Sequence, residues 1–448
     1  MAARICIIGA GISGLSAGYQ LRKAGFKPVI FEKESFVGGR MGSEIVEGFV
    51  IDKGAYTISE FHKTTIQIIK ELGMEGSLQE TSGTSSTFVN GKEYQIKIGS
   101  PIDFLKYKLL SIKNKKDMVN LFLYATSLGK SLNLNNPSEK TFEVEKESAA
   151  EFVLREYDRE ILEYIAYPIF CEIFLGTPEN NSKAAFLATI RNLTRFRIFS
   201  LDQGLGMLPE HLAKRLDVKL SSPVLNIRRI ESKSQYSVDI GGSTPQSLIF
   251  DEVIFAIPAP IIPQLFEDLP SPVEECFGQV EYAPSIVVAI AVDRPYPDSS
   301  FINNLLRKDF GILGTLVFDH HKGSGRAPSG KALATAILSE NASRTLLDAS
   351  EHVVMQGVMK EMDTLFSGFS KEVIFLKVYR WRYGAVQLGP GTLYQQSLAR
   401  KALEDHFTNL YLVGDGLYRS SIEVQINIGI KAANRIIEKY KAYQETSD

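Results

Sequence analysis

Apolar runs, a glycine-rich turn and helical spacing follow one another at the start of the chain. Residues 4–8, which are apolar from Ile5 onward, are expected to form a short buried parallel strand. The glycine-rich turn at 9–14 then opens a helix, which we expect to run to residue 24 and to stop at Gly25. Another apolar run at 28–31 predicts a second strand. This order of elements is typical of an α/β domain with a parallel sheet.

The middle and the end of the chain show other patterns. Helical spacing dominates from residue 103 to residue 195. A buried strand is expected at 410–416, and a helix follows it from 421 to 440. Alternating apolar strands are predicted between these regions, at 286–292, 332–338 and 373–379. We therefore expect a second domain in which helices cover a mixed sheet.

Length and charge narrow the class of protein. Since a domain usually has about 100–200 residues, a chain of 448 residues suggests two or three domains. The 50 basic and 52 acidic residues leave a net charge of −2, which gives no general electrostatic basis for binding nucleic acid. The longest later apolar stretch, 283–292, is about half of the ~20 residues that span a bilayer, so no transmembrane helix is predicted.

The cysteines and two adjacent histidines bear on metals and on location. Cys6, Cys171 and Cys276 are far apart and form no CxxC pair, so neither a disulfide framework nor a zinc site is expected. A reducing, cytoplasmic compartment fits this usage. His320 and His321 precede a stretch rich in Gly, Ser and Pro, which is typical of a solvated loop. We assign no metal site.

The glycine-rich turn has the spacing of a dinucleotide-binding loop. Gly9 is expected to make the tight turn, Gly11 to let backbone N–H groups approach a pyrophosphate, and Gly14 to let the helix pack closely on the strand. The second strand ends in Glu32, which stands roughly 20 residues after Gly14, as expected for the acid that accepts ribose hydroxyls. These features indicate an adenosine dinucleotide but do not separate FAD from NAD.

The residues after Glu32 carry a family resemblance. Glu32, five further residues and then Gly38-Gly39-Arg40 are similar to the E-x(5)-GGR signature of the flavin amine oxidase superfamily. The resemblance implies a Rossmann-like (GR2-type) FAD-binding domain, with the two glycines and Arg40 along the FAD pyrophosphate. It also implies non-covalent FAD, because the segment 381–430 contains no cysteine, and its single histidine, His406, lies in a polar helix.

Further segments match the superfamily in the same order along the chain. Residues 203–209 resemble the GG-x(3)-LP turn, with Gln203 in place of its first glycine. The family uses the N-terminus of the C-terminal helix at the flavin, where this chain has Val424-Gln425 instead of the usual Gly-Ala. The cofactor-binding residues that the loop and the resemblance imply are Gly9, Ala10, Gly11, Ser13, Gly14, Glu32, Lys33, Gly38, Gly39, Arg40, Ala55, Tyr56, Val224, Trp381, Gly414, Asp415 and Glu423.

One stretch favours a particular branch of the superfamily. Ser148 to Phe152, followed by Pro168 and Gly176, resembles the pattern of the protoporphyrinogen oxidases. The cofactor motifs lie at the start, middle and end of the chain. The FAD-binding domain is therefore expected to combine 1–95, 204–282 and 386–448, and the substrate domain to combine 96–203 and 283–385.

Three residues are candidates for the substrate pocket, namely Tyr56, Val288 and Tyr383. Many amine-oxidising relatives carry a lysine in the strand at 284–289, bonded through water to the reactive flavin nitrogen, and alignment puts Val288 in its place. Valine cannot hold that water, so amine oxidation is disfavoured. Trp381 resembles the tryptophan that the family places beside the flavin. No acid or base residue is assigned.

The stretch 104–130 combines lysines, among them Lys106, Lys108, Lys113, Lys115 and Lys116, with large apolar residues. A solvated helix face is the preferred interpretation. The alternative is a peripheral contact with an anionic membrane or a guarded apolar entrance.

The leading functional hypothesis is an FAD enzyme that removes hydride from a largely apolar or cyclic small molecule, in a dehydrogenation like that of protoporphyrinogen oxidases or desaturases. One alternative is an amine or amino-acid oxidase of the same superfamily. The other is a non-catalytic, flavin-bound protein that binds a partner, because one fold hosts many functions.

Overall fold

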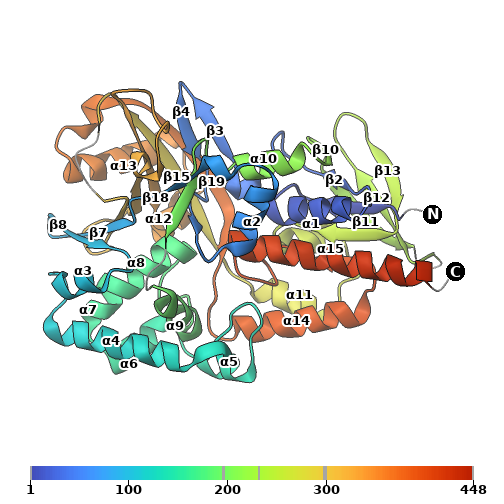
Figure 1. Ribbon diagram of the computed structural model, residues 1–448, viewed down its shortest axis with the longest axis horizontal. Helices are drawn as coiled ribbons and strands as arrows, with labels where there is room; N and C mark the ends of the chain where they lie inside the picture. The colour runs from blue at the N-terminus through green and yellow to red at the C-terminus, as the bar shows by residue number, and fades with distance from the viewer. Residues whose placement is uncertain (1–2, 194–196, 231–232, 296–299, 446–448) are drawn as a thin grey trace.

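Figure 1 shows the computed structural model, which describes residues 3–193, 197–230, 233–295 and 300–445. The last two residues of the helical stretch predicted at 103–195 lie outside these ranges, as do a few residues within the predicted domain segments. Helices and strands form two regions, one around a parallel sheet and one around a mixed sheet.

The parallel sheet forms the first region. Its strands stand in the order β10 (Asp217–Lys219), β2 (Val29–Phe31), β1 (Ile5–Ile8), β14 (Glu252–Phe255) and β20 (Leu410–Leu412). The helices α1 (Ile12–Lys23) and α15 (Ile422–Glu445) lie side by side, as Figure 1 shows in blue and red. They approach closely because Gly429 has no side chain, and a Cβ there would lie 2.3 Å from the carbonyl oxygen of Ser13. The predicted first strand, second strand and terminal helix are therefore present.

Smaller elements surround this sheet. An antiparallel sheet consists of β11 (Val224–Ile230), β12 (Gln235–Ile240) and β13 (Gln246–Phe250). Two helices, α11 (Ser271–Gln279) and α14 (Thr392–His406), lie side by side below α15 in Figure 1. The remaining elements near the cofactor motifs are β3 (Ser43–Val46), β4 (Phe49–Asp52), β5 (Ile58–Ser59), α2 (Lys63–Glu71), β6 (Leu78–Glu80), β9 (Ile198–Leu201) and α10 (Met207–Ala213).

The second region is built on a mixed sheet. Its strand order is β19 (Val373–Val386), β15 (Tyr282–Val292), β18 (Ala332–Leu338), β17 (Leu313–Phe318), β16 (Ile302–Leu305), β7 (Thr84–Val89) and β8 (Lys92–Lys97), and only β16 and β7 run parallel. The three strands expected at 286–292, 332–338 and 373–379 belong to it. Two helices, α12 (Glu340–Leu346) and α13 (Glu351–Leu365), supply residues to the apolar core on one face of the sheet.

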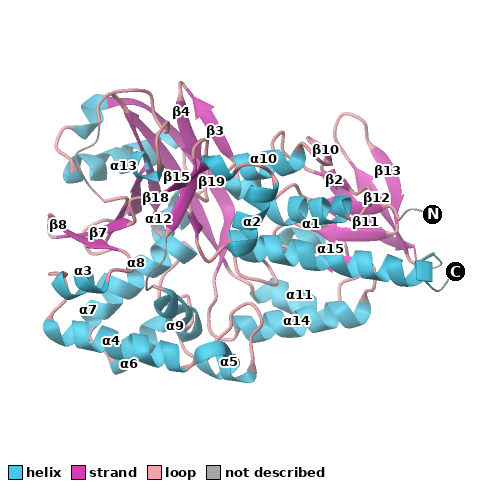
Figure 2. Ribbon diagram, viewed as in Figure 1, coloured by secondary structure: helices cyan, strands magenta, loops and turns pink. Residues whose placement is uncertain are grey.

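A group of helices covers the sheet at its lower end, as Figure 2 shows in cyan. Ser148 caps one of them through a reciprocal bond with Glu151, as its S-x-x-E spacing favours. Two turns between Leu162 and Phe174 are π-helical. The helices are α3 (Pro101–Lys106), α4 (Ile112–Ser127), α5 (Glu139–Val144), α6 (Ala149–Glu156), α7 (Arg159–Ile161), α8 (Tyr167–Ile169) and α9 (Lys183–Asn192). The predicted α/β fold with a mixed-sheet and helical second region is confirmed.

Candidate functional site

A large cavity runs between the two regions. Its volume is about 1460 Å³, above the ~300–1,000 Å³ of typical small-molecule pockets. The cavity begins where the parallel strands β1 and β2 end, which is where open α/β sheets bind their ligands. It extends to the mixed sheet, where Val287, Ile337 and Trp381 line it. There is room for a dinucleotide together with a substrate.

The three glycines of the loop have three different environments. A Cβ on Gly9, whose φ is +99°, would lie 2.6 Å from the carbonyl oxygen of Ala256. A Cβ on Gly14 would lie 2.2 Å from the carbonyl oxygen of Gly9, so these two positions exclude side chains for packing reasons. A Cβ on Gly11 would meet no protein atom within 4 Å, because Gly11 borders the cavity. Only a ligand would require glycine there, so this loop fits a pyrophosphate.

Glu32 lies at the end of β2, on the cavity wall. Its carboxylate accepts hydrogen bonds from the backbone N–H groups of Ala10 (2.7 Å) and Glu34 (3.0 Å). These bonds fix the carboxylate beside the glycine loop, and each oxygen keeps a further lone pair for a ribose hydroxyl. Ala10 itself is fully buried and does not line the cavity.

Arg40 and Asp415 form an ion pair that spans the cavity wall. The Arg40 guanidinium donates to Asp415 at 2.6 Å and to the carbonyl oxygens of Tyr383 and Gly384. Asp415 is buried and also accepts from the hydroxyls of Tyr282 and Ser420. The two residues were expected to contact different parts of FAD, and the structure shows that they also bind each other.

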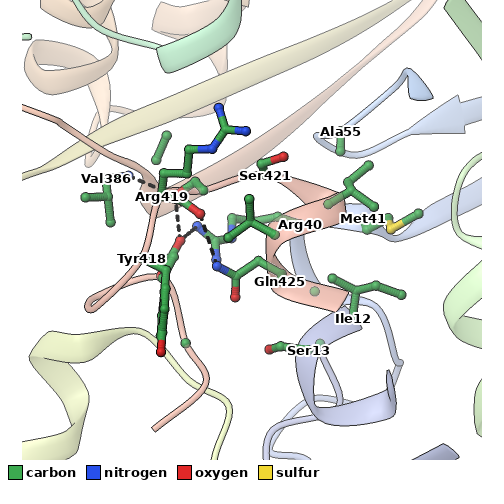
Figure 3. Close-up of a pocket in the computed structure, with 18 of the residues that line it drawn as sticks. Ile12, Ser13, Arg40, Met41, Ala55, Val386, Tyr418, Arg419, Ser421 and Gln425 are labelled. Atoms are coloured by element: carbon green, nitrogen blue, oxygen red, sulfur yellow. Dashed lines mark hydrogen bonds and ion pairs between the residues drawn. The ribbon is translucent and has the colours of Figure 1, made fainter. Parts of the chain in front are cut away.

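The N-terminus of α15 faces the glycine loop across the cavity (Figure 3). Ser421 and Gln425 lie on this side, and the Gln425 amide donates to the carbonyl oxygen of Arg419 at 3.2 Å. Glu423 lines the cavity but accepts the backbone N–H groups of Thr64 and Thr65, at 2.9 Å each. Glu423 therefore also caps helix α2 from outside.

Aromatic side chains form the other end of the cavity. The indole N–H of Trp381 donates to the carbonyl oxygen of Lys53 at 2.8 Å, which fixes the ring on the wall. Tyr56 is buried, and this burial holds the pKa of its hydroxyl well above the usual range. Tyr383 packs edge-on against Tyr282, with ring centroids 5.3 Å apart. Trp381, Tyr56 and Tyr383 all line the cavity, and the Tyr56 hydroxyl is neutral at pH 7.

A buried charge cluster supports this wall. Asp52 at the end of β4 binds Lys322 at 3.0 Å and Arg326 at 3.1 Å, and it accepts the backbone N–H of Leu205. Burial alone would raise the pKa of Asp52, but Arg326 and Lys322 lower it below its ordinary value. Leu205 belongs to the turn that resembles GG-x(3)-LP, so the cluster ties that turn to the residues that precede Tyr56.

The expectation that Val288 faces the flavin is wrong. Alternate residues of a strand point to opposite faces of its sheet. In β15, Ser285 and Val287 line the cavity, whereas Val288 is fully buried in the apolar core on the other face, together with Val354 and Val358. Val287, one position earlier, lines the cavity instead. β15 has no lysine at any position. This strand therefore lacks the lysine of the amine oxidases, whichever of its residues faces the cavity.

Most predicted cofactor residues come together around the cavity. Of that set, only Ala10 and Gly14 do not line it. The sequence did not point to Glu172, His62 or Arg419, which also line it. Burial lowers the pKa of His62 to about 4 and raises that of Glu172 to about 7. One signal was available, because Glu172 lies within the stretch that resembles the protoporphyrinogen oxidases.

Two negative findings concern the described residues only. No group of three or more His, Cys, Asp or Glu side chains in this part of the chain could hold a metal ion. A search of the same residues found no helix with the length and apolar character needed to cross a membrane.

The fold is that of an α/β protein with a large cavity between a parallel sheet and a mixed sheet. The chain belongs to the family of flavin-containing amine oxidoreductases, whose model matches residues 12–437, and it is a flavin-dependent oxidoreductase. It is 23% identical over 488 residues to protoporphyrinogen oxidase 2 of Arabidopsis thaliana, covering 97% of this chain and 94% of that protein.

Two solved structures have the same fold. One is a protein of Exiguobacterium sp. 255-15 assigned as a protoporphyrinogen oxidase, with a TM-score of 0.78, 19% identity and coverage of 98% of this chain and 99% of that chain. The other is the cyclohexylamine oxidase of Brevibacterium oxydans IH-35A, with a TM-score of 0.75, 17% identity and coverage of 98% and 100%. At these identities, the likeness establishes the fold alone.

Proposed function

We propose that the cavity holds FAD non-covalently and that the enzyme removes hydride from a largely apolar or cyclic substrate. The observation that carries this proposal is the continuity of the cavity from the glycine loop at Gly11 to the aromatic wall at Trp381. Bound FAD would supply the two-electron acceptor. Segments 1–95, 204–282 and 386–448 would form the cofactor half, and 96–203 and 283–385 the substrate half.

Residues of this chain would hold the cofactor in defined ways. The N–H groups at the start of α1 and the Arg40 guanidinium would contact the pyrophosphate, and Glu32 would accept the ribose hydroxyls. Val224 at the start of β11 also lines the cavity, in support of an adenine contact. The three cysteines of the chain are free and buried, in support of a cytoplasmic location.

The substrate wall supports an apolar substrate. Phe174, Leu175, Leu193, Val287 and Ile337 line the cavity near the aromatic side chains. The resemblance to protoporphyrinogen oxidases covers nearly the whole chain, in support of a cyclic, porphyrinogen-like compound. The protein's part in the reaction would be to orient a C–H bond toward the flavin and to exclude water.

An amine oxidase is the alternative, since the fold is shared with cyclohexylamine oxidase. The absence of lysine from β15 disfavours it.

The test is an anaerobic screen in which porphyrinogens, polyenes, primary amines and L-amino acids are mixed with the flavin-loaded protein. We expect a cyclic or polyene-like compound to bleach the flavin absorbance and simple amines to fail. Rapid, saturable bleaching by an ordinary amine would overturn the proposed substrate class.

A further inference from the structure

Glu172 is the one acidic side chain that the helical segment around Pro168 presents to the cavity. It lies in a π-helical turn, Phe170–Phe174, and such turns occur often at functional sites. Phe170 and Cys171 of the same turn are buried in the core and do not line the cavity. The turn therefore directs Glu172 and Ile173 away from that core, toward the cavity.

Neighbouring elements hold this turn in place from both sides. The side-chain amide of Gln387 donates to the carbonyl oxygen of Phe174 at 2.9 Å. A Cβ on Gly314 of β17 would lie 2.4 Å from the sulfur of Cys171, so the strand and the turn are in close contact. Leu175 ends the turn with a φ of +55°, in the left-handed region. These contacts hold the backbone of the turn that carries Glu172.

Little in the surroundings of the Glu172 carboxylate stabilises its negative charge. Among the described residues, none donates a hydrogen bond to it, and burial raises its pKa to about 7. The negative charge of Glu172 raises the pKa of two groups. One is the Tyr56 hydroxyl, which also lines the cavity, and the other is the adjacent Cys171 thiol. Burial keeps both neutral, because it holds the pKa of Tyr56 well above its usual range and raises that of Cys171 to about 12.

The charged groups on the elements around Glu172 bind other partners. Arg191 on α9 lines the same cavity, but its guanidinium donates to the carbonyl oxygen of Gly129. The charge of Glu340 on α12 raises the pKa of the Cys171 thiol, and its carboxylate accepts hydrogen bonds from Asn180 and Arg344. A half-buried carboxylate without a partner is costly to keep ionised, and perturbed carboxyls of this kind are concentrated at active sites.

We propose that Glu172 accepts the proton that the substrate loses when its hydride leaves. The inference rests on the proposed function and deepens it. The substrate C–H bond breaks, and its hydrogen leaves as hydride to the bound flavin. An N–H or C–H bond on the adjacent atom also breaks. Its electron pair becomes the second bond of the new C=N or C=C, and its proton passes to a carboxylate oxygen of Glu172, which later releases it to solvent.

The first test uses the flavin-loaded enzyme and the compound that bleaches it best. The anaerobic bleaching rate at saturating substrate is measured from pH 5 to pH 9 in the native protein, Glu172→Gln, Glu172→Asp and Glu145→Gln. The native rate should rise through about pH 7, because a base must be ionised to accept a proton. Glu172→Gln should be slower by roughly 10²–10⁴-fold and lose that rise, while Glu172→Asp recovers part of both.

Glu145→Gln is the matched control. Glu145 is buried and its pKa is also raised to about 7, but it lies away from the cavity and accepts the backbone N–H groups of Leu393 and Tyr394. Its substitution should keep the bleaching rate and the pH profile. An unchanged profile in Glu172→Gln, or an increase in KM alone, would overturn the inference while leaving the proposed function intact.

A second readout does not depend on turnover. A glutamate whose pKa is about 7 in the folded state and about 4.3 in the unfolded state stabilises the fold fully below about pH 4, and this contribution is lost as pH rises through 7. Glu172→Gln should therefore gain thermal stability over the native protein between pH 5 and pH 8. A constant difference in Tm would show that Glu172 does not titrate there, which overturns the inference. Failure of every compound to bleach the flavin would overturn the proposed function first, and this inference with it.

Discussion

Gly11→Val separates the binding of a cofactor from the stability of the fold. The backbone at Gly11 is extended (φ −70°, ψ 172°), a conformation that valine adopts readily, and a Cβ there meets no protein atom within 4 Å. The valine side chain would instead enter the cavity at the start of α1 and displace the phosphate from the N–H groups. A hydrogen bond to a charged group contributes roughly 1.5–3 kcal/mol, so the loss of one such bond weakens FAD binding by about 10- to 150-fold.

The assay has two parts, the flavin-to-protein ratio after gel filtration and the Tm of the flavin-free protein. Gly11→Val should lose flavin while its flavin-free form melts within ~1 °C of the native one. Gly76→Val is the matched control, because a Cβ at Gly76 also meets no protein atom but lies outside the cavity, and it should retain flavin. Gly14→Ala should lower the Tm itself, since its Cβ would lie 2.2 Å from a carbonyl oxygen. Full flavin retention by Gly11→Val would refute the assignment of this loop.

Three further predictions concern the cofactor and the surface. The protein should be yellow and should release intact FAD into the supernatant on acid precipitation, whereas colour in the pellet would indicate a covalent flavin. Glu32→Ala should weaken FAD binding by about tenfold or more, measured by flavin fluorescence, and Glu32→Arg should weaken it further. On helices α3 and α4, Leu105 and Ile112 are 67% and 88% exposed near several lysines, as the alternative of a membrane contact requires. The protein should therefore co-sediment with anionic vesicles at low salt and detach as salt rises, and no binding at low salt would restore the solvated-face interpretation.

Local signals in the sequence predicted well which residues line the end of the cavity at the glycine loop. The glycine loop is a continuous segment whose backbone needs are visible in residue type, as the close approach at Gly9 shows. The pairing of Arg40 with Asp415 was not predictable in this way. The two residues are 375 positions apart, and each belongs to a sequence motif of its own.

The two errors at the substrate end also have physical causes. Val288 was misplaced because a shift of one residue in a strand exchanges the two faces of the sheet, and β15 is apolar on both faces. Glu172 was missed because a π-helical turn departs from the 3.6-residue period, so helical spacing does not show which of its residues face a cavity.

A pair of lysine substitutions in β15 tests the corrected register directly. Val287 lines the cavity, so the stem of a lysine in Val287→Lys can lie along its wall and keep the ammonium in the space proposed for the flavin. We expect this variant to fold and to shift the flavin absorbance spectrum and the rate of reaction with oxygen. In Val288→Lys the ammonium would be buried without a partner in the apolar core on the other face, at a cost of about 3–5 kcal/mol. That variant should unfold at lower urea concentration, and any folded fraction should keep the native flavin spectrum. If Val288→Lys were stable and spectrally altered while Val287→Lys behaved like the native protein, Val288 would face the flavin after all, and the original alignment would be right.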